Sequence, residues 1–487
     1  MDTQRTPTGI SGLDAVLQGG VPSSRLYLVL GSPGTGKTTL ALQFLMEGAR
    51  NGETVLFITL SESADELQVT ARSHGWDISG VEIFELSAAD QLVDLDLQQT
   101  IFPPAEVELT ETTNALISTL ERLRPTRIVF DTLSDLRMMA GAALTYRRQL
   151  LFLKQRLIEY RATVLLLEDD LEEGEDIQSV VHGVIALENP APDYGGERRR
   201  IRIAKMRGTP FVGGYHDFRI LTGGIEIYPR LVAADSRAPA TGGQIATGVP
   251  GLDEMLGSGL ELGTAALIMG PAGSGKSTIV MQSAASAANQ GMKTAMYLFD
   301  ERPQTLFARA DALGMGFQKH VDDGTITVQQ IDPAELSPGE FYSLIQVAVQ
   351  RDNVQVVVID SLSGFLNAMP SERYLILQLH ELMTYLAQKG VTTLMVLGQT
   401  GTRDGFQSPV DISYLADTVL QTGYFERDGE TRTSVAVFKR RTGMHDRTTR
   451  ELIFVSGGLQ VDRDNTIRPS VILRGVNDFG GDSGGGK

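Results

Sequence analysis

The chain has 487 residues, a formal net charge of −17, no cysteine and six histidines. The lack of cysteine excludes disulfides and thiolate metal sites, and the scattered histidines form no closely spaced pair that would bind a transition metal. The acidic balance disfavours broad binding to nucleic acid, which depends on Lys and Arg that neutralise phosphates. No apolar run approaches the roughly 18 residues of a membrane span, and the N-terminus has no secretory h-region, so we expect a cytoplasmic protein without membrane contact.

The first informative segment is a glycine-rich loop, Gly31-Ser-Pro-Gly-Thr-Gly-Lys37-Thr38, which follows the apolar run 26–30. It fits the pattern G-x-x-x-x-G-K-[ST] in the strand–loop–helix setting that this pattern requires. The glycines let backbone N–H groups surround a triphosphate, the lysine adds a positive charge, and the hydroxyl is a ligand for Mg²⁺. We therefore predict a nucleoside triphosphate site with Mg²⁺ at the Thr38 hydroxyl. The predicted contacts with the nucleotide are Gly34, Thr35, Gly36, Lys37, Thr38 and Thr39.

Strand-like and helix-like segments alternate after this loop. We expect helices at 38–48, 111–123 and 146–160, and strands at 54–59, 127–130, 163–167, 184–188 and 200–205. This alternation predicts an α/β domain whose mostly parallel, twisted sheet is covered by helices on both faces. Asp131 directly follows the strand at 127–130, the position from which a carboxylate orients Mg²⁺, here through water.

Acidic residues follow the strand at 54–59, which we expect next to the strand of the loop. Hydrolysis of ATP needs a group that polarises the attacking water beside the γ-phosphate. Glu62 stands at the expected place for this catalytic group. The alternative interpretation is that the segment only starts a helix, because Ser61 and Ser63 are suitable N-cap residues.

The densest group of basic residues follows later in the first half of the chain. Its members are Arg198, Arg199, Arg200, Arg202, Lys205 and Arg207. In an extended strand, the alternation of Arg and Ile at 199–203 puts basic side chains on one face. This face either meets phosphates, of nucleic acid or of a neighbour's nucleotide, or forms a solvated strand edge.

The second half of the chain repeats the first. Lys276 stands 239 positions after Lys37, as Gly251 does after Gly12 (276 − 37 and 251 − 12). Internal repetition at a fixed distance indicates duplicated structural units. We therefore predict two tandem domains at 1–232 and 244–475, joined by a linker of small and polar residues at 233–243. The Gly-rich tail at 476–487 is expected to be disordered.

The chemical features recur in this second domain, whose strands are expected at 294–299, 354–359 and 392–397. Its loop reads Gly270-Pro-Ala-Gly-Ser-Gly-Lys276-Ser277, and the predicted nucleotide contacts are Gly273, Ser274, Gly275, Lys276, Ser277 and Thr278. The Ser277 hydroxyl and, through water, Asp360 are the expected Mg²⁺ groups. Asp300 and Glu301 end a strand and are the expected catalytic acids, with an N-cap role for Asp300 as the alternative.

Several longer motifs stand out along the chain. They are Ala71-Arg-Ser-His-Gly-Trp76-Asp77, Arg147-Arg148, Glu197-Arg-Arg-Arg200, Ala204-Lys-Met-Arg-Gly-Thr209, Asp411-Ile-Ser-Tyr-Leu-Ala-Asp417, Phe438-Lys-Arg-Arg441 and His445-Asp446. Through these motifs the chain resembles the KaiC family, whose members are double-domain ATPases and autokinases of the RecA-like P-loop superfamily. The resemblance extends over nearly the whole chain. It implies two RecA-like domains and a hexameric double ring with ATP between subunits, in which the first ring drives assembly.

The resemblance also implies that cations of one subunit stabilise phosphoryl transfer on its neighbour's nucleotide. In the first ring these contacts would come from Lys205, Met206, Arg207 and Thr209, and in the second ring from Lys439 and Arg441. Ser73 would lie near the first-ring nucleotide of its own subunit. This arrangement accounts for the basic cluster without nucleic acid.

For the reaction, the resemblance implies slow ATP hydrolysis in the first domain and phosphate transfer to a neighbouring subunit in the second. The phosphorylated Ser-Thr pair of the family corresponds here to Ser413 and Tyr414. We expect phosphorylation at Ser413, because the Tyr414 hydroxyl is carried farther from the backbone and better fits a packed aromatic at a subunit interface. Ser61 and Asp300 replace the first residue of the family's two glutamate pairs, which leaves Glu62 alone in the first domain.

Compared with this family, we expect the C-terminal extension that meets an activating partner to be shortened here. A KaiB-like or other signalling protein is the partner that the resemblance suggests. Two other functional classes stay open. The first is a RecA-like recombination or repair ATPase, which DNA would stimulate strongly. The second is a signalling scaffold that nucleotide assembles and that has no kinase activity.

Overall fold

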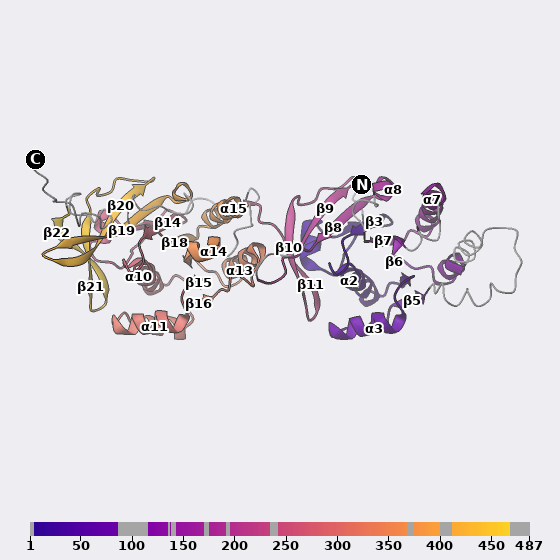
Figure 1. Ribbon diagram of the computed structural model, residues 1–487, viewed down its shortest axis with the longest axis horizontal. Helices are drawn as coiled ribbons and strands as arrows, with labels where there is room; N and C mark the ends of the chain where they lie inside the picture. Colours follow the sequence, from indigo (N-terminus) through magenta and orange to yellow (C-terminus); the bar gives the residue numbers. More distant parts are fainter. Residues whose placement is uncertain are drawn as a thin grey trace, which may run out of the picture. The chain divides into compact units, whose positions relative to one another are not determined.

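The computed structural model describes residues 4–85, 115–134, 137, 143–169, 175–190, 195–233, 242–367, 374–399 and 412–467. The chain forms two compact units, Met1–Arg230 and Leu231–Lys487, and Figure 1 shows both in the colours of the sequence. Most of the linker expected at 233–243 and the whole tail at 476–487 lie outside the described residues, as does the start of the helix expected at 111–123.

The first unit is built on one large sheet, whose described strands run in the order β11-β10-β9-β8-β3-β7-β6-β4-β5. From β8 to β5 each strand is parallel to its neighbour, and β9, β10 and β11 extend the sheet in antiparallel fashion. The strands of this sheet are β3 (Leu26–Leu30), β4 (Val55–Thr59), β5 (Glu82–Glu85), β6 (Arg127–Asp131), β7 (Thr163–Glu168), β8 (Gly183–Glu188), β9 (Arg200–Met206), β10 (Tyr215–Leu221) and β11 (Gly224–Tyr228). The other elements are the pair β1 (Arg5–Thr6) and β2 (Val21–Pro22), and α1 (Ser11–Val16), α2 (Lys37–Arg50), α3 (Ala64–Ser73), α7 (Ala143–Glu159) and α8 (Glu175–Val180).

The second unit repeats this sheet strand for strand, in the order β22-β21-β20-β19-β14-β18-β17-β15-β16. Its strands are β14 (Ala265–Gly270), β15 (Thr294–Leu298), β16 (Ile326–Gln330), β17 (Val356–Asp360), β18 (Thr392–Gly398), β19 (Thr418–Arg427), β20 (Glu430–Arg440), β21 (Arg450–Val455) and β22 (Gly458–Thr466). The other elements are the pair β12 (Gln244–Ile245) and β13 (Leu260–Glu261), the 3₁₀ turn η3 (Ser413–Leu415), and α9 (Leu252–Met255), α10 (Lys276–Asn289), α11 (Pro303–Ala312), α12 (Phe317–Asp322), α13 (Pro338–Gln350), α14 (Leu362–Asn367) and α15 (Leu375–Gln388). The α/β fold with duplicated, mostly parallel sheets, predicted from the sequence, is confirmed.

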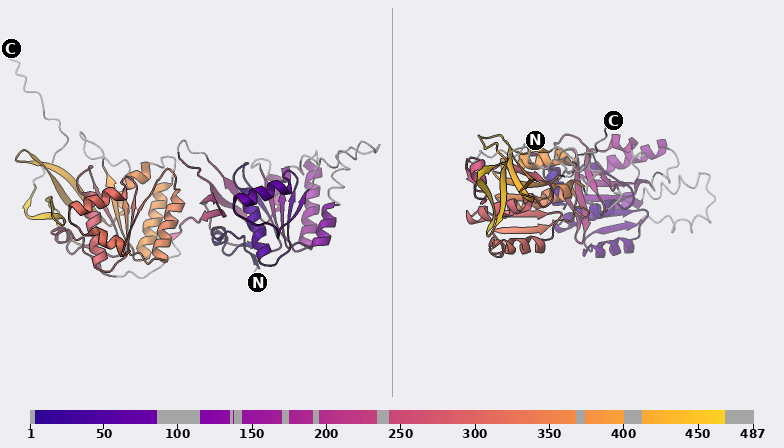
Figure 2. Two further views of the ribbon diagram at one scale, coloured as in Figure 1. Left: turned by 90° about the horizontal axis from the view of Figure 1, so that it is seen from below. Right: turned by 60° about the vertical axis from the view of Figure 1, so that its left-hand side comes forward.

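Each sheet is buried on both faces because successive residues of its central strands point to opposite sides. In β3, Tyr27 and Val29 belong to the apolar cluster that includes residues of α2, whereas Leu28 belongs to the cluster that includes residues of α7. Figure 2 shows the sheets edge-on between two layers of helices. Within the described ranges, every helix is too short or too polar to cross a lipid bilayer.

The strands expected from the sequence begin and end within two residues of the expected bounds. The strand expected at 354–359 begins at Val356, because the Val354 N–H donates to the Ala348 carbonyl and closes the end of α13 instead of entering the sheet. The strands β10 and β11, which complete the antiparallel edge, were not expected from the sequence. They place His216 and Phe218 in the interior of the first unit.

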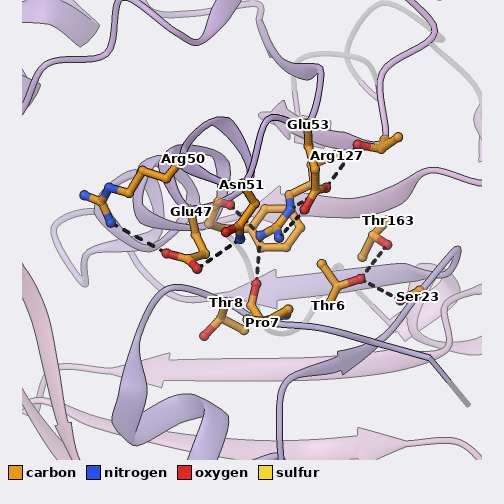
Figure 3. Close-up of polar contacts among 12 residues, drawn as sticks. Thr6, Pro7, Thr8, Ser23, Glu47, Arg50, Asn51, Glu53, Arg127 and Thr163 are labelled. Atoms are coloured by element: carbon orange, nitrogen blue, oxygen red, sulfur yellow. Dashed lines mark hydrogen bonds and ion pairs between the residues drawn. The ribbon is translucent and has the colours of Figure 1, made fainter. Parts of the chain in front are cut away.

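A buried arginine, Arg127, joins the first residues of the chain to the loop helix α2 (Figure 3). Its side chain is 1% exposed and donates two hydrogen bonds to Glu53, at 2.9 and 2.7 Å. It also donates to the carbonyls of Pro7 (2.7 Å) and Phe44 (2.9 Å) and lies 4.9 Å from the centre of the Phe44 ring. All these contacts compensate the burial of its charge, and they anchor the segment before α1 beside α2.

Candidate nucleotide sites

The first glycine-rich loop connects β3 to α2, as its motif predicts. Gly34 and Gly36 have φ angles of +80° and +100°, in the left-handed region that favours glycine. A Cβ atom on Gly36 would also lie 2.7 Å from the Cδ1 atom of Ile220, which would have to shift, so the positive φ is the main reason why this position favours glycine. The Thr35 hydroxyl and N–H both bond the Ser32 carbonyl and hold the turn closed. Thr39 is buried in the first turn of α2. The loop therefore presents the N-terminus of α2 to an anion.

Lys37 is held in this loop by a carbonyl and a carboxylate. Its ammonium donates to the Gly31 carbonyl at 2.6 Å and forms an ion pair with Asp169 at 2.6 Å. The lysine side chain is 7% exposed, whereas that of Asp169 is 40% exposed. Asp169 was not among the residues expected from the sequence. It directly follows β7, which pairs with β3, and carboxyl ends of neighbouring parallel strands meet at one edge.

Asp131 and Thr38 meet at the same edge, where the Thr38 hydroxyl donates to Asp131 at 3.2 Å. Burial raises the pKa of Asp131 from its usual 3.8 to about 7. The negative charge of Glu62 adds to this rise, while the Thr38 hydroxyl and the Lys37 ammonium oppose it. The arrangement thus brings together the predicted metal-orienting acid, the predicted metal-ligating hydroxyl and the predicted catalytic acid.

The backbone of Glu62 is fixed by two hydrogen bonds with Thr59, and neither of them involves its carboxylate. The Thr59 hydroxyl accepts from the Glu62 N–H at 3.0 Å and donates to the Glu62 carbonyl at 2.8 Å. Burial raises the pKa of Glu62, and the charge of Glu66 adds to this rise. The N-cap of α3 is Ser63, whose side chain accepts from the Glu66 N–H in a capping box, so neither Ser61 nor Glu62 is needed for that purpose.

The second loop has the same form between β14 and α10. Gly273 and Gly275 have φ angles of +77° and +90°, and the Lys276 ammonium donates to the Pro271 carbonyl at 2.6 Å. The Ser274 hydroxyl bonds both the Pro271 carbonyl and the Thr422 hydroxyl. Thr278 is buried in the first turn of α10. Burial lowers the pKa of Lys276, and the nearby Asp360 partly offsets this effect.

The acids of the second unit are more heavily engaged than Glu62. Asp300 accepts a hydrogen bond from the Ser361 hydroxyl. Glu301 accepts two hydrogen bonds from Arg309, both at 2.8 Å. The N-cap of α11 is Arg302, without a side-chain cap, so Asp300 does not serve as the N-cap. Asp360 has a buried oxygen, Oδ2, without a hydrogen-bond partner, and burial raises its pKa to about 6 despite the Ser277 hydroxyl.

The structure places the predicted cations far from the loop of their own unit. In the first unit, Met206 lies opposite Gly183, which in turn lies opposite Tyr27 near the start of β3, whereas the loop follows the end of β3. In the second unit, Lys439 lies opposite Val419, which pairs with Leu267 near the start of β14. These cations therefore sit at the edge of the sheet opposite to the edge that carries the loop.

Both comparisons with known proteins point to one family. The sequence model of the KaiC ATPase family matches residues 6–232 and again residues 245–466. The chain belongs to the KaiC family of ATPases. This confirms the resemblance inferred from its motifs, and membership in this family implies ATP binding.

Curated relatives resemble the chain over nearly its whole length. The circadian clock oscillator protein KaiC of Parasynechococcus marenigrum (strain WH8102) is 27% identical, over 98% of this chain and 93% of that protein. KaiC of Picosynechococcus sp. (strain ATCC 27264 / PCC 7002 / PR-6) is 28% identical, over 94% of this chain and 89% of that protein. The protein called KaiC 1 of Synechocystis sp. (strain ATCC 27184 / PCC 6803 / Kazusa) is 28% identical, over 92% and 87%.

In this KaiC-family chain, the cations of the opposite edge clamp equivalent turns in the two units. The Lys205 ammonium donates to the carbonyls of Gln178 and Val181, and Lys439 donates to those of Ser413 and Ala416. Arg207 and Arg441 likewise donate to the carbonyls of the next residues, Ser179 (3.0 Å) and Tyr414 (2.7 Å). The predicted acceptor Ser413 thus occupies the place that Gln178 holds in the first unit.

The remaining predicted contacts of the KaiC resemblance are dispersed. The Ser73 hydroxyl donates to the Thr70 carbonyl at 2.7 Å within α3, and Thr209 accepts from Arg5 at 2.5 Å. The basic cluster is not one uninterrupted face. Arg200 pairs with Glu188 at 2.9 Å and stacks on Tyr215, at the edge that carries the loop, whereas Lys205 and Arg207 lie at the other edge.

Proposed function

We propose that this protein is a hexameric ATPase and serine autokinase in which every nucleotide lies between two copies of the chain. One copy supplies the glycine-rich loop, and its neighbour supplies the cations. The observation that carries the proposal is the position of those cations and of Ser413 at the sheet edge opposite to their own loop. The names of the relatives support a role in signalling or in circadian timing.

Distance along the strand supports transfer between chains over transfer within one chain. β14 has six residues, and a strand rises about 3.3 Å per residue, so it spans roughly 20 Å. Asp417, at the Ser413 side, donates to the Ala265 carbonyl, whereas the loop leaves β14 at Gly270. Reacting atoms must approach to about 3–3.5 Å. Ser413 therefore meets the γ-phosphate of a neighbouring copy and not that of its own loop.

In the first domain the described groups support hydrolysis. Lys37 neutralises charge on the phosphates, and Glu62 accepts a proton from the attacking water. The raised pKa of Glu62 makes its carboxylate a stronger base than an exposed one. Lys205 and Arg207 of the neighbouring copy, with Met206 and Thr209 beside them, complete the site from the other side, and Ser73 lies near the nucleotide of its own copy.

Mg²⁺ fits the polar groups that the two loops leave available. Thr38 and Ser277 would supply hydroxyls, and Asp131 and Asp360 would orient the ion through water. The Oδ2 atom of Asp360 is buried without a hydrogen-bond partner and could accept a hydrogen bond from such a water. When bound, the ion neutralises charge on the β- and γ-phosphates. Among the described residues no group of three or more His, Cys, Asp and Glu could hold a metal by itself, so the ion would be expected to bind together with the phosphates of the nucleotide.

In the second domain the proposed step is phosphorylation of Ser413. Its hydroxyl oxygen bonds to the γ-phosphorus, the bond from that phosphorus to the β,γ-bridging oxygen breaks, and ADP leaves. The hydroxyl proton passes to Glu301 of the copy that carries the loop, with Asp300 beside it. Lys439 and Arg441 hold the Ser413 turn through its carbonyls, which fixes the acceptor at the interface. Tyr414, which is 50% exposed, packs against the neighbouring copy in this arrangement.

The test is phosphorylation with γ-labelled ATP. We expect label on the wild type and on Tyr414→Phe, and little on Ser413→Ala or Glu301→Gln. Ser343→Ala, a serine of α13, is the control. Mixed assemblies of Ser413→Ala with Glu301→Gln should regain label on the Glu301→Gln chain, since one copy then supplies the base and the other the acceptor. Equal labelling of all single variants would contradict the assignments, and a mixture without label would contradict transfer between copies.

A further inference from the structure

The two domains differ in what surrounds their catalytic glutamates. Thr59 pairs with Asp131 in the first sheet, and Leu298 pairs with Asp360 in the second. Glu62 comes three residues after Thr59 and Glu301 three residues after Leu298, so the two glutamates hold equivalent places. Both carboxylate oxygens of Glu301 accept from the Arg309 guanidinium, at 2.8 Å each. This is the paired geometry in which arginine fixes a carboxylate most firmly.

The first domain lacks this partner. The residue eight positions after Glu62 is Thr70 on α3, where the second domain has Arg309 on α11. Within the part of the chain that the structure describes, no cation forms an ion pair with Glu62. A threonine carries no charge that could neutralise the carboxylate, so the ion pair distinguishes the second site from the first.

Arg309 is committed to this one contact. Both of its terminal nitrogens bond Glu301, and its Nε is buried without a hydrogen-bond partner. The ion pair is sheltered, with side chains 30% and 21% exposed. A residue present mainly to fasten α11 would use its remaining donor as well, and α11 is already packed through the buried side chains Leu306 and Ala310.

We propose that Arg309 is a positioning residue that restrains Glu301 and thereby slows turnover at the second site. The inference rests on the proposed function, in which Glu301 accepts the proton of the attacking group. A carboxylate whose two oxygens both accept hydrogen bonds from a guanidinium must give up at least one of those bonds before it takes a proton. Each turnover in the second domain therefore includes loss of part of this ion pair, a step that the first domain does not have.

The experiment measures the second site alone in the full chain. Glu62→Gln removes the base of the first site, and Arg309→Thr then gives the second site the residue of the first. We expect kcat for phosphate release to rise about fivefold, the equivalent of one partly exposed charged contact, with little change in KM for ATP. Labelling of Ser413 should become faster by a similar factor.

Arg309→Lys separates orientation from charge, because Arg309 also lowers the pKa of Asp360. A lysine keeps the charge but not the paired geometry. We expect its kcat to lie between those of the wild type and Arg309→Thr, and this variant carries the test if Arg309→Thr fails to fold. The reciprocal change, Thr70→Arg in a Glu301→Gln background, should lower kcat of the first site.

The outcomes separate this inference from the proposed function. The double variant Glu62→Gln/Glu301→Gln should release almost no phosphate. If it does so and Arg309→Thr leaves kcat unchanged or lowers it, the inference is wrong and the proposed function stands. If the double variant is as active as Glu62→Gln alone, Glu301 is not the base, and both fall. A change in thermal stability with kcat unchanged would show that the pair is only structural and would also overturn the inference.

Discussion

The Lys37 ammonium lies 2.6 Å from the Asp169 carboxylate, whereas Lys276, its counterpart in the second domain, forms no ion pair with any described carboxylate. The sheet register explains the difference. Leu30 pairs with Glu168, just before Asp169, and Met269 pairs with Leu397, just before Gly398. The second domain thus has a glycine where the first has an acid. A phosphate that binds Lys37 must compete with Asp169, and one that binds Lys276 has no such competitor.

The first prediction concerns ATP affinity. Asp169→Asn keeps the shape of the side chain but removes the negative charge that occupies Lys37, so the first site should bind ATP more tightly, by about fivefold for this partly exposed pair. Equilibrium binding of a non-hydrolysable ATP analogue, in a Lys276→Ala background, measures the first site. Asp65→Asn, an exposed acid of α3, is the control. Weaker binding to Asp169→Asn would show that Asp169 assists the nucleotide instead of competing with it.

The sequence was enough to predict which residues of the candidate site come together within one short segment. The glycines, lysines and hydroxyls of both loops follow from a contiguous motif, and Asp131 and Asp360 follow from the apolar strands that precede them. Their places at the edge of the sheet require only that parallel strands end together.

The parts that could not be predicted depend on pairings between distant segments. Asp169 contacts Lys37 because β7 lies beside β3, and nothing in the sequence fixes that order of strands. From the sequence, Arg309 is expected to be an ordinary charged residue of a surface helix, and only the folded chain shows that it contacts Glu301. Likewise, the basic residues at 198–207 look like one stripe in the sequence. However, β9 runs from the end of the sheet that carries the loop to the opposite end, so the first and last of these residues lie apart.

The second prediction is a pH dependence of stability in the nucleotide-free protein. Burial raises the pKa of Asp131 from 3.8 to about 7, so the folded chain holds this proton between these pH values and the unfolded chain does not. The free energy of unfolding therefore falls as pH rises from about 4 through 7. Asp131→Asn stays neutral throughout. It should stabilise the first domain at pH 8 by about 3 kcal/mol, and by progressively less toward pH 5.

Trp76, the single tryptophan, reports unfolding of the first domain by its fluorescence. Thermal unfolding of wild type and Asp131→Asn at pH 5.5 and pH 8 gives the comparison, and the lower pH serves as the internal control. A difference in Tm that is the same at both pH values would mean that the substitution acts through packing and not through the proton.

The third prediction concerns the buried cation of the first domain. Arg127→Ala leaves Glu53 without its cationic partner and removes one donor from each of the carbonyls of Pro7 and Phe44, so it should destabilise this domain by about 3 kcal/mol. The matched control is Arg122→Ala, because Arg122 is 63% exposed and forms a longer ion pair with Glu82, at 3.6 Å. The control should change stability by well under 1 kcal/mol. Equal effects on the Trp76 transition would show that the burial of Arg127 is of no energetic consequence.

The fourth prediction concerns assembly. A nucleotide held between two copies stabilises their interface by mass action, so weakening a loop lysine should weaken the ring. As part of the proposed function, the resemblance to the KaiC family implies that the first domain drives assembly. Lys37→Ala should therefore reduce ATP-dependent hexamers more than Lys276→Ala, and Lys293→Ala, an exposed lysine, should leave them intact. Native mass spectrometry at equal ATP and protein concentrations gives the populations. Unchanged hexamers in Lys37→Ala would mean that the first nucleotide does not join the subunits.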